Sequence, residues 1–300
     1  MSSFTEINTR FPIRNTPEQK QAFRDYVLGL EGLNAKVETL EKHDNVVIGD
    51  PENAKVIFTA HYDTPRNMLI PNLMLPASKP LYYLYQMCVI VPLLAISVGA
   101  GLFVMSRGDS LLWREAGLLT YLVVYFGLFF LIMKRGINKA NFNDNTSGAS
   151  AVIDLALKMP ERLRGKVAFV LFDDEEKGLK GSKAMAKAHP AIKENTLVIN
   201  LDCVGNGENF VCVYNKALAG DPVLEEIRKL LPDVRLVCIS RGSCNSDQKS
   251  FSRGIGVCAC RKNRFGTLYT PYIHTKKDTV VNPANMDKLV NAFINADKLI

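Results

Sequence analysis

The segment KVAFVLFDDEE, residues 166–176, joins an uninterrupted apolar run to four adjacent carboxylates, Asp173, Asp174, Glu175 and Glu176. A short apolar run of this kind, bounded by polar residues, is typical of a strand buried on both faces of a sheet. Four neighbouring negative charges repel one another, so they require positive charge nearby. The sequence around them offers only the separated lysines of EKGLKGSK. We therefore expect metal ions to supply the missing charge.

Two further apolar runs end in the same way. KVIFTA, residues 55–60, leads into His61 and Asp63, and TLVINL, residues 196–201, leads into Asp202. Helical segments separate these runs, which predicts an α/β fold with a mixed, mainly parallel sheet covered by helices on both faces. Because parallel strands end at the same edge of such a sheet, we expect these polar residues to converge in one crevice.

The other elements are predicted from caps and periodicity. Thr16, Pro17 and Gln19 form a capping-box pattern, which predicts a helix that runs to about residue 30. Further helices are expected at 147–159, after Gly181, at 222–231 and from about 283. Further strands are expected at 35–40, 45–49, 210–215 and 234–240, and around Cys258 and Cys260.

Two long segments, residues 81–105 and 116–133, contain no charged side chain. A helix that crosses the core of a bilayer needs about 20 apolar residues, so each segment is predicted to span a membrane. A buried helical pair or an apolar oligomer interface is the alternative. The predicted insertion, residues 68–137, is a transmembrane hairpin that divides the α/β domain into residues 1–67 and 138–300.

The orientation follows from geometry and charge. The two ends of the insertion must lie on the same side of the bilayer, because His61 and Asp144 are expected to meet; two crossings satisfy this condition. Lys and Arg near membrane helices favour the cytoplasmic side. The connecting loop has two arginines balanced by Asp109 and Glu115. The flanks on the domain side contain Arg66, Lys79, Lys134, Arg135 and Lys139. We therefore expect a two-pass protein of the cell membrane whose α/β domain faces the cytoplasm.

The composition excludes some classes of function. The formal net charge is +7, but the basic residues are scattered and are not interleaved with aromatics, so we expect no nucleic-acid partner. The seven cysteines have no CxxC spacing, which favours free thiols in a reducing compartment. The polar opening MSSFTEINTRFPIRNTPEQKQ has no apolar core, so no signal peptide is expected. The pattern leaves the oligomeric state open.

Two loops add further metal ligands: Asp144 in NFNDNTSGAS and His274 in YIHTKKDT. Together with the residues after the strands they give two histidines and three carboxylates, a set that suits zinc. Each motif alone has an ordinary explanation, such as a surface His–Asp pair or a solvated acidic turn. Their combination is what favours a metal centre.

Six motifs, in the order AHYDT, NDNTSGAS, FDDEEKGLKGS, NLDCVG, SDQKSF and HTKKDT, resemble the co-catalytic zinc aminopeptidases of the bacterial leucyl aminopeptidase and aminopeptidase Y type. Glutamate carboxypeptidase II belongs to the same group. The resemblance covers nearly all of the soluble part of the chain. It implies a zinc-dependent metallopeptidase that uses two zinc ions and hydrolyses N-terminal residues of peptide substrates.

The resemblance also implies a role for each residue. Glu175 is the implied general base, and Asp63 orients the ring of His61. Asp144 bridges the two metals, and the peptide bond that follows it is expected to be cis. The implied metal ligands are His61 and Asp202 for one zinc, Glu176 and His274 for the other, and Asp144 for both.

Two alternatives remain. One is a glutaminyl-cyclase-like acyltransferase, which has the same fold but works with a single zinc. The other is a catalytically inactive receptor or scaffold of this fold, of the transferrin-receptor kind. The complete ligand set favours hydrolysis. The secreted relatives lack spans between the His-x-Asp motif and the bridging aspartate, so the insertion leaves the route of the substrate open.

Overall fold

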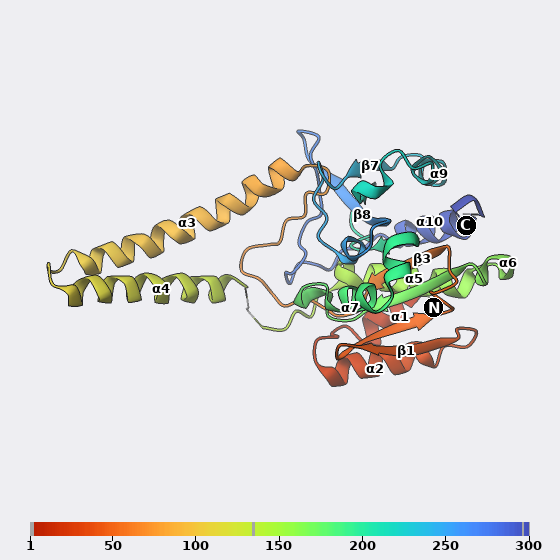
Figure 1. Ribbon diagram of the computed structural model, residues 1–300, viewed down its shortest axis with the longest axis horizontal. Helices are drawn as coiled ribbons and strands as arrows, with labels where there is room; N and C mark the ends of the chain where they lie inside the picture. Colours follow the sequence, from red (N-terminus) through yellow and green to blue (C-terminus); the bar gives the residue numbers. More distant parts are fainter. Residues whose placement is uncertain (1–2, 134–135, 296, 300) are drawn as a thin grey trace.

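The computed structural model describes residues 3–133, 136–295 and 297–299. Within these residues the α/β part is built on one nine-stranded sheet with the order β1-β2-β4-β3-β5-β8-β6-β7, and β9 pairs with β8 (Figure 1). The strands are β1 Ala35–Leu40, β2 His43–Ile48, β3 Val56–His61, β4 Val167–Phe172, β5 Leu197–Leu201, β6 Asn209–Tyr214, β7 Arg235–Cys238, β8 Gly254–Lys262 and β9 Leu268–Tyr269.

The centre of the sheet is parallel, as the apolar strands predict. β4, β3, β5 and β8 run parallel to one another, whereas β2 and β6 pair antiparallel with the outer strands of this group. The prediction of a mixed sheet with a parallel core is confirmed. The core strands end at one edge, which places the residues that follow them close together.

Helices cover both faces of the sheet. Phe58 of β3 packs in one apolar cluster with Ile153 and Phe293, whereas its neighbour Ile57 packs on the other face with Met185. The helices of the α/β part are α1 Ser3–Arg10, α2 Pro17–Leu28, α5 Gly148–Lys158, α6 Glu161–Arg164, α7 Lys180–Ala188, α8 Pro190–Asn195, α9 Val223–Leu230 and α10 Pro283–Phe293. The capping box at Thr16 is present.

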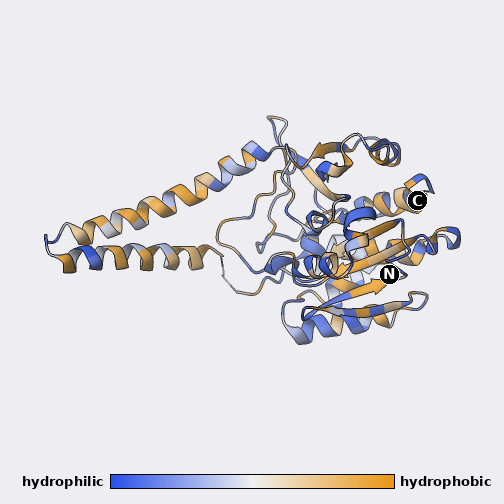
Figure 2. Cartoon of the chain, in the orientation of Figure 1, coloured by the Kyte–Doolittle hydropathy of each residue, from blue (hydrophilic) through white to orange (hydrophobic). Residues whose placement is uncertain are grey.

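Two long helices, α3 Lys79–Met105 and α4 Leu111–Met133, project together from the α/β part (Figure 1). They pack closely where Gly101 meets Gly117, because a Cβ on Gly101 would lie 2.8 Å from the carbonyl oxygen of Gly117. Hydrophobic residues follow one another along most of both helices (Figure 2), and many of these apolar side chains are exposed. α4 begins at Leu111 rather than at 116, because Leu, Arg and Glu among the residues before the apolar run are good helix formers and extend the helix to 23 residues.

The ends of the hairpin return to the same place. Arg66 and Ile137 form an antiparallel bridge, and the amide of Asn67 donates to the carbonyl of Gly136 at 3.0 Å. The predicted basic residues Lys134 and Arg135 lie outside the described residues. The chain therefore leaves the α/β part at residues 66–67 and returns to it beside them, at residues 136–137.

Candidate metal centre

The three polar strand ends meet at the carboxyl edge of the sheet. His61 is the last residue of β3 and lies opposite Phe172, the last residue of the parallel neighbour β4. Asp202 follows β5, the parallel neighbour of β3 on its other side. The predicted convergence is thus a consequence of strand order.

One group of ligand atoms forms around His61. Its Nε2 lies 3.4 Å from Oδ1 of Asp144 and 3.6 Å from Oδ1 of Asp202. All three side chains are buried. One imidazole nitrogen and two carboxylates are therefore close enough to share one cation.

A second group forms around His274. Its Nε2 lies 3.2 Å from Oδ2 of Asp144 and 3.3 Å from Oε2 of Glu176. Asp144 consequently directs one oxygen to each histidine. The two groups share this carboxylate, which is the arrangement expected of a residue that bridges two cations.

Unpartnered oxygens provide a test of whether a metal fits. Oε1 of Glu176 and Oδ1 of Asp202 are buried and have no hydrogen-bond partner among the described residues. A buried carboxylate oxygen without a partner is costly, and a divalent cation would satisfy both. Since imidazole and carboxylate are ligands that zinc accepts, the residues present fit zinc.

The electrostatics agree with this fit. Burial raises the pKa of Glu175 and that of Glu176 well above the usual range of a carboxyl group. Burial acts to lower the pKa of His61, but the neighbouring carboxylates, Glu175 foremost, outweigh it and raise that pKa. The site without metal therefore holds protons that a bound cation would displace.

Asp144 lies in the segment η1, Phe142–Ser147, which leads into α5 and whose backbone departs from helical geometry at Asp144 and Asn145. The peptide bond from Asp144 to Asn145 is cis, as the resemblance implies. The carboxylate of Asp278 accepts the backbone amides of Asn143 at 3.1 Å and of Asp144 at 2.9 Å. Burial raises the pKa of Asp278 to about 8. Sequence reasoning gave Asp278 no role, although it lies within the quoted motif HTKKDT.

The carboxylate of Asp63 contacts both His61 and the turn that carries Glu175 and Glu176. Its Oδ1 lies 3.3 Å from Nδ1 of His61. The same carboxylate accepts the backbone amides of Glu175 at 3.0 Å and of Glu176 at 3.1 Å. It therefore contacts the histidine of one group and the backbone of the acidic turn that carries the other.

The acidic run divides into two pairs with different surroundings. Glu175 and Glu176 begin the short 3₁₀ helix η2, Glu175–Lys177, and face His61. Asp174, in the left-handed backbone region, starts this turn with φ 52°. The adjacent backbone thus turns sharply between the second and third carboxylates.

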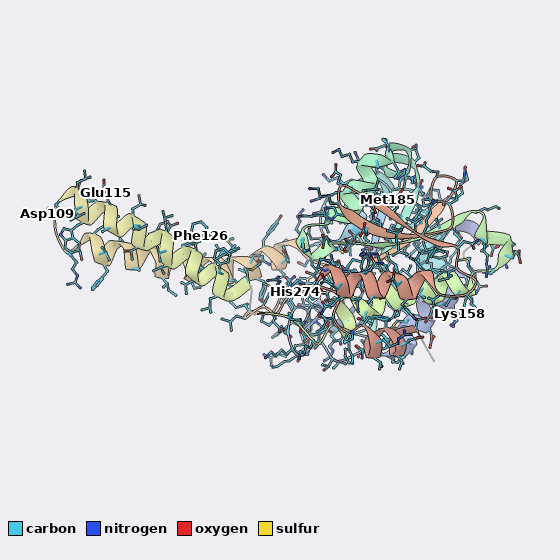
Figure 3. The ribbon with its side chains drawn as sticks, turned by 90° about the horizontal axis from the view of Figure 1, so that it is seen from below. Asp109, Glu115, Phe126, Lys158, Met185 and His274 are labelled. Atoms are coloured by element: carbon cyan, nitrogen blue, oxygen red, sulfur yellow. The ribbon has the colours of Figure 1, made fainter. Side chains whose placement is uncertain are left out.

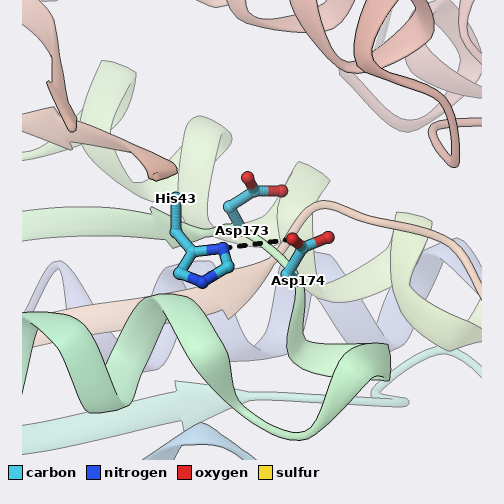
Figure 4. Close-up of side chains that lie close together, drawn as sticks. All are labelled: His43, Asp173 and Asp174. Atoms are coloured by element: carbon cyan, nitrogen blue, oxygen red, sulfur yellow. Dashed lines mark hydrogen bonds and ion pairs between the residues drawn. The ribbon is translucent and has the colours of Figure 1, made fainter. Parts of the chain in front are cut away.

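Asp173 and Asp174 are neutralised by protein groups, which corrects the expectation that no basic group stands beside them. Nζ of Lys20 lies 2.6 Å from Oδ1 of Asp173 and also pairs with Asp174. Asp174 further pairs with Lys177 at 2.8 Å and with Nδ1 of His43 at 3.1 Å (Figure 4). Lys20 comes from α2, far away in sequence. Within the acidic run, Glu175 and Glu176 are therefore the two carboxylates that a metal ion would have to neutralise.

Asp247 is another residue whose role the sequence left open. It starts the 3₁₀ helix η4, Asp247–Ser250, and its side chain is fully buried. Burial raises its pKa to about 7, and the nearby Asp63 and Asp202 add to this effect. The only signal in the sequence is its place in the motif SDQKSF.

Two adjoining cavities open beside the ligands. The smaller, of about 230 Å³, is lined by both ligand groups and by Glu175. The larger, of about 640 Å³, extends from Glu176 and His274 to the base of the hairpin. Figure 3 places His274 on the side of the α/β part that faces the hairpin. Tyr82 of α3 and Asn72 line both cavities, so residues of the insertion border the candidate site.

Solved structures share this fold at low sequence identity. The LapA aminopeptidase of Legionella pneumophila aligns with a TM-score of 0.56 and 14% identity, over 99% of this chain and 69% of that one. The glutaminyl cyclase of Fimbriiglobus ruber aligns with a TM-score of 0.55 and 14% identity, over 99% and 93%. The TET1 peptidase of Pyrococcus horikoshii aligns with a TM-score of 0.52 and 14% identity, over 97% and 98%. At such identities the likeness concerns the fold.

Sequence comparison is more specific. A search of the curated proteins gave no significant match. The family model described as peptidase family M28 matches residues 135–297, which is more than half of the chain and includes Asp144, the acidic turn, Asp202 and His274. The protein belongs to peptidase family M28.

Proposed function

We propose that this protein is a membrane-anchored zinc aminopeptidase. The observation that carries the proposal is the pair of ligand groups that share Asp144, with Glu175 beside them. Membership of family M28 and the aminopeptidases among its structural neighbours support peptide hydrolysis.

The proposed ligands follow the two groups. His61 and Asp202 would hold one zinc ion, Glu176 and His274 would hold the second, and Asp144 would contribute one oxygen to each. Bound zinc supplies Lewis acidity and lowers the pKa of water in the site.

Glu175 is the proposed proton carrier. It lies among the ligands, and it is absent from both of the groups that share Asp144. Burial raises its pKa, which favours a carboxylate that can accept a proton near neutral pH. Glu175 takes the proton of the attacking water and passes it to the nitrogen of the departing amine. Asp63 orients His61 through Nδ1 and holds the amide of Glu175.

We further propose that α3 and α4 cross a bilayer. Both are long and apolar enough to do so, and their outward side chains include Leu102 and Phe103, each 60% exposed, and Leu112, 71% exposed. Exposed apolar surface on this scale requires lipid or a protein partner. Arg66, Lys79 and Lys139 at the domain side support the proposal that this side faces the cytoplasm, because basic residues near membrane helices favour that side.

A glutaminyl-cyclase-like reaction is the competing function, since one structural neighbour is such an enzyme. Hydrolysis is favoured because carboxylate and imidazole ligands are present for two cations rather than one. The experiment is metal analysis of purified protein with an assay of three peptides, one with a free amino terminus, one acetylated and one beginning with glutamine. Two zinc ions are expected, together with release of amino acids from the peptides that have a free amino terminus and none from the acetylated peptide. Cyclisation of the glutaminyl peptide, or cleavage of the acetylated peptide at the same rate, would contradict the proposal.

A further inference from the structure

The insertion forms part of the wall beside the candidate site. The larger cavity begins at Glu176 and His274 and ends between α3 and α4, where Val89 and Phe129 line it. Its volume of about 640 Å³ lies within the usual range of about 300–1,000 Å³ for ligand pockets. It is thus a continuation of the catalytic crevice with room for more than the scissile bond.

The walls of this cavity are bonded to one another. The hydroxyl of Tyr85 in α3 donates a hydrogen bond to the carbonyl of Pro71, and the amide of Leu69 donates to the carbonyl of Ile132 in α4 at 2.9 Å. The segment between the α/β part and the hairpin is therefore fixed to both helices. The base of the hairpin has a defined position relative to the site.

The chemistry of the lining changes along the cavity. Two of its basic residues, Lys20 and Lys177, already pair with Asp174. Toward the hairpin the lining is mainly apolar. The apolar side chains there are Met68, Ile70, Val89, Phe129, Ile132 and Met133. A lining of this kind binds apolar groups and leaves polar groups without partners.

We propose that the larger cavity is a subsite for a bulky apolar side chain next to the scissile bond, and that residues of the hairpin determine this specificity. The inference rests on the proposed peptidase function and adds its substrate class: peptides with large apolar residues at the point of cleavage. The direction in which the peptide chain binds decides whether that residue lies on the amino or the carboxyl side of the scissile bond.

The test uses the full chain in detergent micelles with zinc and three tripeptides, Phe-Gly-Gly, Gly-Phe-Gly and Gly-Gly-Gly. One of the two phenylalanine peptides is expected to have a kcat/KM at least about tenfold above that of Gly-Gly-Gly, because apolar pockets discriminate about 10–200-fold per methylene group. Val89→Phe should fill the cavity and remove about tenfold of this preference, measured as the ratio of kcat/KM for the favoured phenylalanine peptide to that for Gly-Gly-Gly. Val91→Phe is the matched control, since Val91 lies in the same helix, is 55% exposed and lines neither cavity.

Binding provides a second readout that needs no turnover. In a Glu175→Gln background, calorimetry should give a lower Kd for the favoured peptide than for Gly-Gly-Gly, and Val89→Phe should abolish the difference. Cleavage of all three peptides with no apolar preference, or a preference that survives Val89→Phe, would overturn the subsite and leave the peptidase intact. Absence of cleavage by zinc-loaded wild-type protein, together with equal Kd values, would reject both the peptidase and the subsite.

Discussion

The backbone amide of Met68 donates a hydrogen bond of 2.8 Å to the carbonyl oxygen of His274. Met68 is the first residue of the predicted insertion, and His274 is a proposed zinc ligand. His274 has a φ of 59° and Tyr272 one of 68°, so this loop holds two residues in the left-handed region that non-glycine residues rarely adopt. The bond supports the loop from the side of the hairpin. A hydrogen bond therefore joins the insertion to the loop that carries His274.

Glu175→Gln should retain zinc and lose turnover. Its carboxylate moves a proton, and removing such a group costs about 10²–10⁴-fold in rate. Glu176→Gln should instead lose zinc, because its carboxylate belongs to the His274 group. Zinc content and kcat measured on both variants check the assignment. Near-full activity of Glu175→Gln would show that another residue carries the proton.

Lys20→Met should destabilise the protein strongly. The variant leaves the buried Asp173 without its ammonium partner and Asp174 with only Lys177 and His43, and breaking a buried ion pair on one side costs about 3–5 kcal/mol. Lys229→Met is the control, because Lys229 pairs with Glu226 at an exposed position where such pairs contribute about 0–1 kcal/mol. Thermal unfolding of both variants gives the comparison. Equal melting temperatures of the two variants would mean that the ion pairs of Lys20 do not stabilise the packing of α2.

His189 should make stability depend on pH. Burial acts to lower its pKa, but Glu52 and Glu38 outweigh burial and raise it. A raised pKa in the folded state means that the stabilisation is complete below the unfolded value of about 6.5 and disappears as pH rises through the folded value. His189→Gln should therefore cost about 0.3–1 kcal/mol at pH 5.5 and nothing at pH 9. Melting curves at both pH values test this.

The control for His189→Gln is Lys193→Gln in α8, which removes an exposed lysine that pairs with Glu194 and leaves His189 in place. Its effect on the melting temperature should be the same at pH 5.5 and pH 9. If His189→Gln lost more stability at pH 9 than at pH 5.5, the pH dependence would be opposite to the expected one. That result would contradict a stabilising role for the ion pairs of His189 with Glu38 and Glu52.

The hairpin should require detergent for extraction. Treatment of membranes with salt or carbonate should leave the full chain in the pellet, because α3 and α4 expose apolar side chains along their length. A membrane-impermeant maleimide applied to intact cells should label Ser110→Cys, which lies between the two helices, and leave a cysteine added at the C-terminus unlabelled. Labelling of the C-terminus alone would reverse the proposed orientation.

Replacing residues 68–136 with a short linker should give a protein that needs no detergent and still binds zinc. The bridge between Arg66 and Ile137 shows that the two ends are adjacent, and no proposed ligand lies in the removed segment. Gel filtration and zinc analysis check the outcome. A deletion variant that folds but binds no zinc would mean that the base of the hairpin, where Met68 bonds to His274, is needed to position His274.

Much of the parallel core could be predicted from the sequence, because its strands are short, apolar and followed by ligands. The predicted residues His61 and Asp202 lie where strand order puts them. The extra turn of α4 was missed because a search for apolar runs stops at the charges before residue 116. Arg114 and Glu115 interrupt the apolar run, so hydropathy alone does not join Leu111, Leu112 and Trp113 to the helix.

The partner of Asp173 and Asp174 could not be predicted, because Lys20 lies in α2, 153 residues before Asp173 in the sequence, and only the tertiary fold brings them together. The roles of Asp278 and Asp247 were missed for a related reason. The carboxylate of Asp278 accepts hydrogen bonds from the backbone amides of Asn143 and Asp144. Every residue except proline has such an amide, so the sequence does not show which amides a carboxylate will bind. The contact of Tyr82 with the cavities likewise depends on how the hairpin sits on the α/β part.

The length of α3 has a kinetic consequence. In the proposed membrane arrangement the 27 residues of α3, at about 1.5 Å per residue, would span about 40 Å, more than the hydrocarbon core of about 30 Å, so part of the helix would reach the membrane surface. Tyr82 and Tyr85 lie near the end of α3 that joins the α/β part, and they line the larger cavity. A peptidase with this cavity at the membrane surface would meet membrane-bound peptides by lateral diffusion in two dimensions. Its rate on such peptides should follow their mole fraction in the lipid, and diluting the vesicles with buffer should leave turnover per enzyme unchanged.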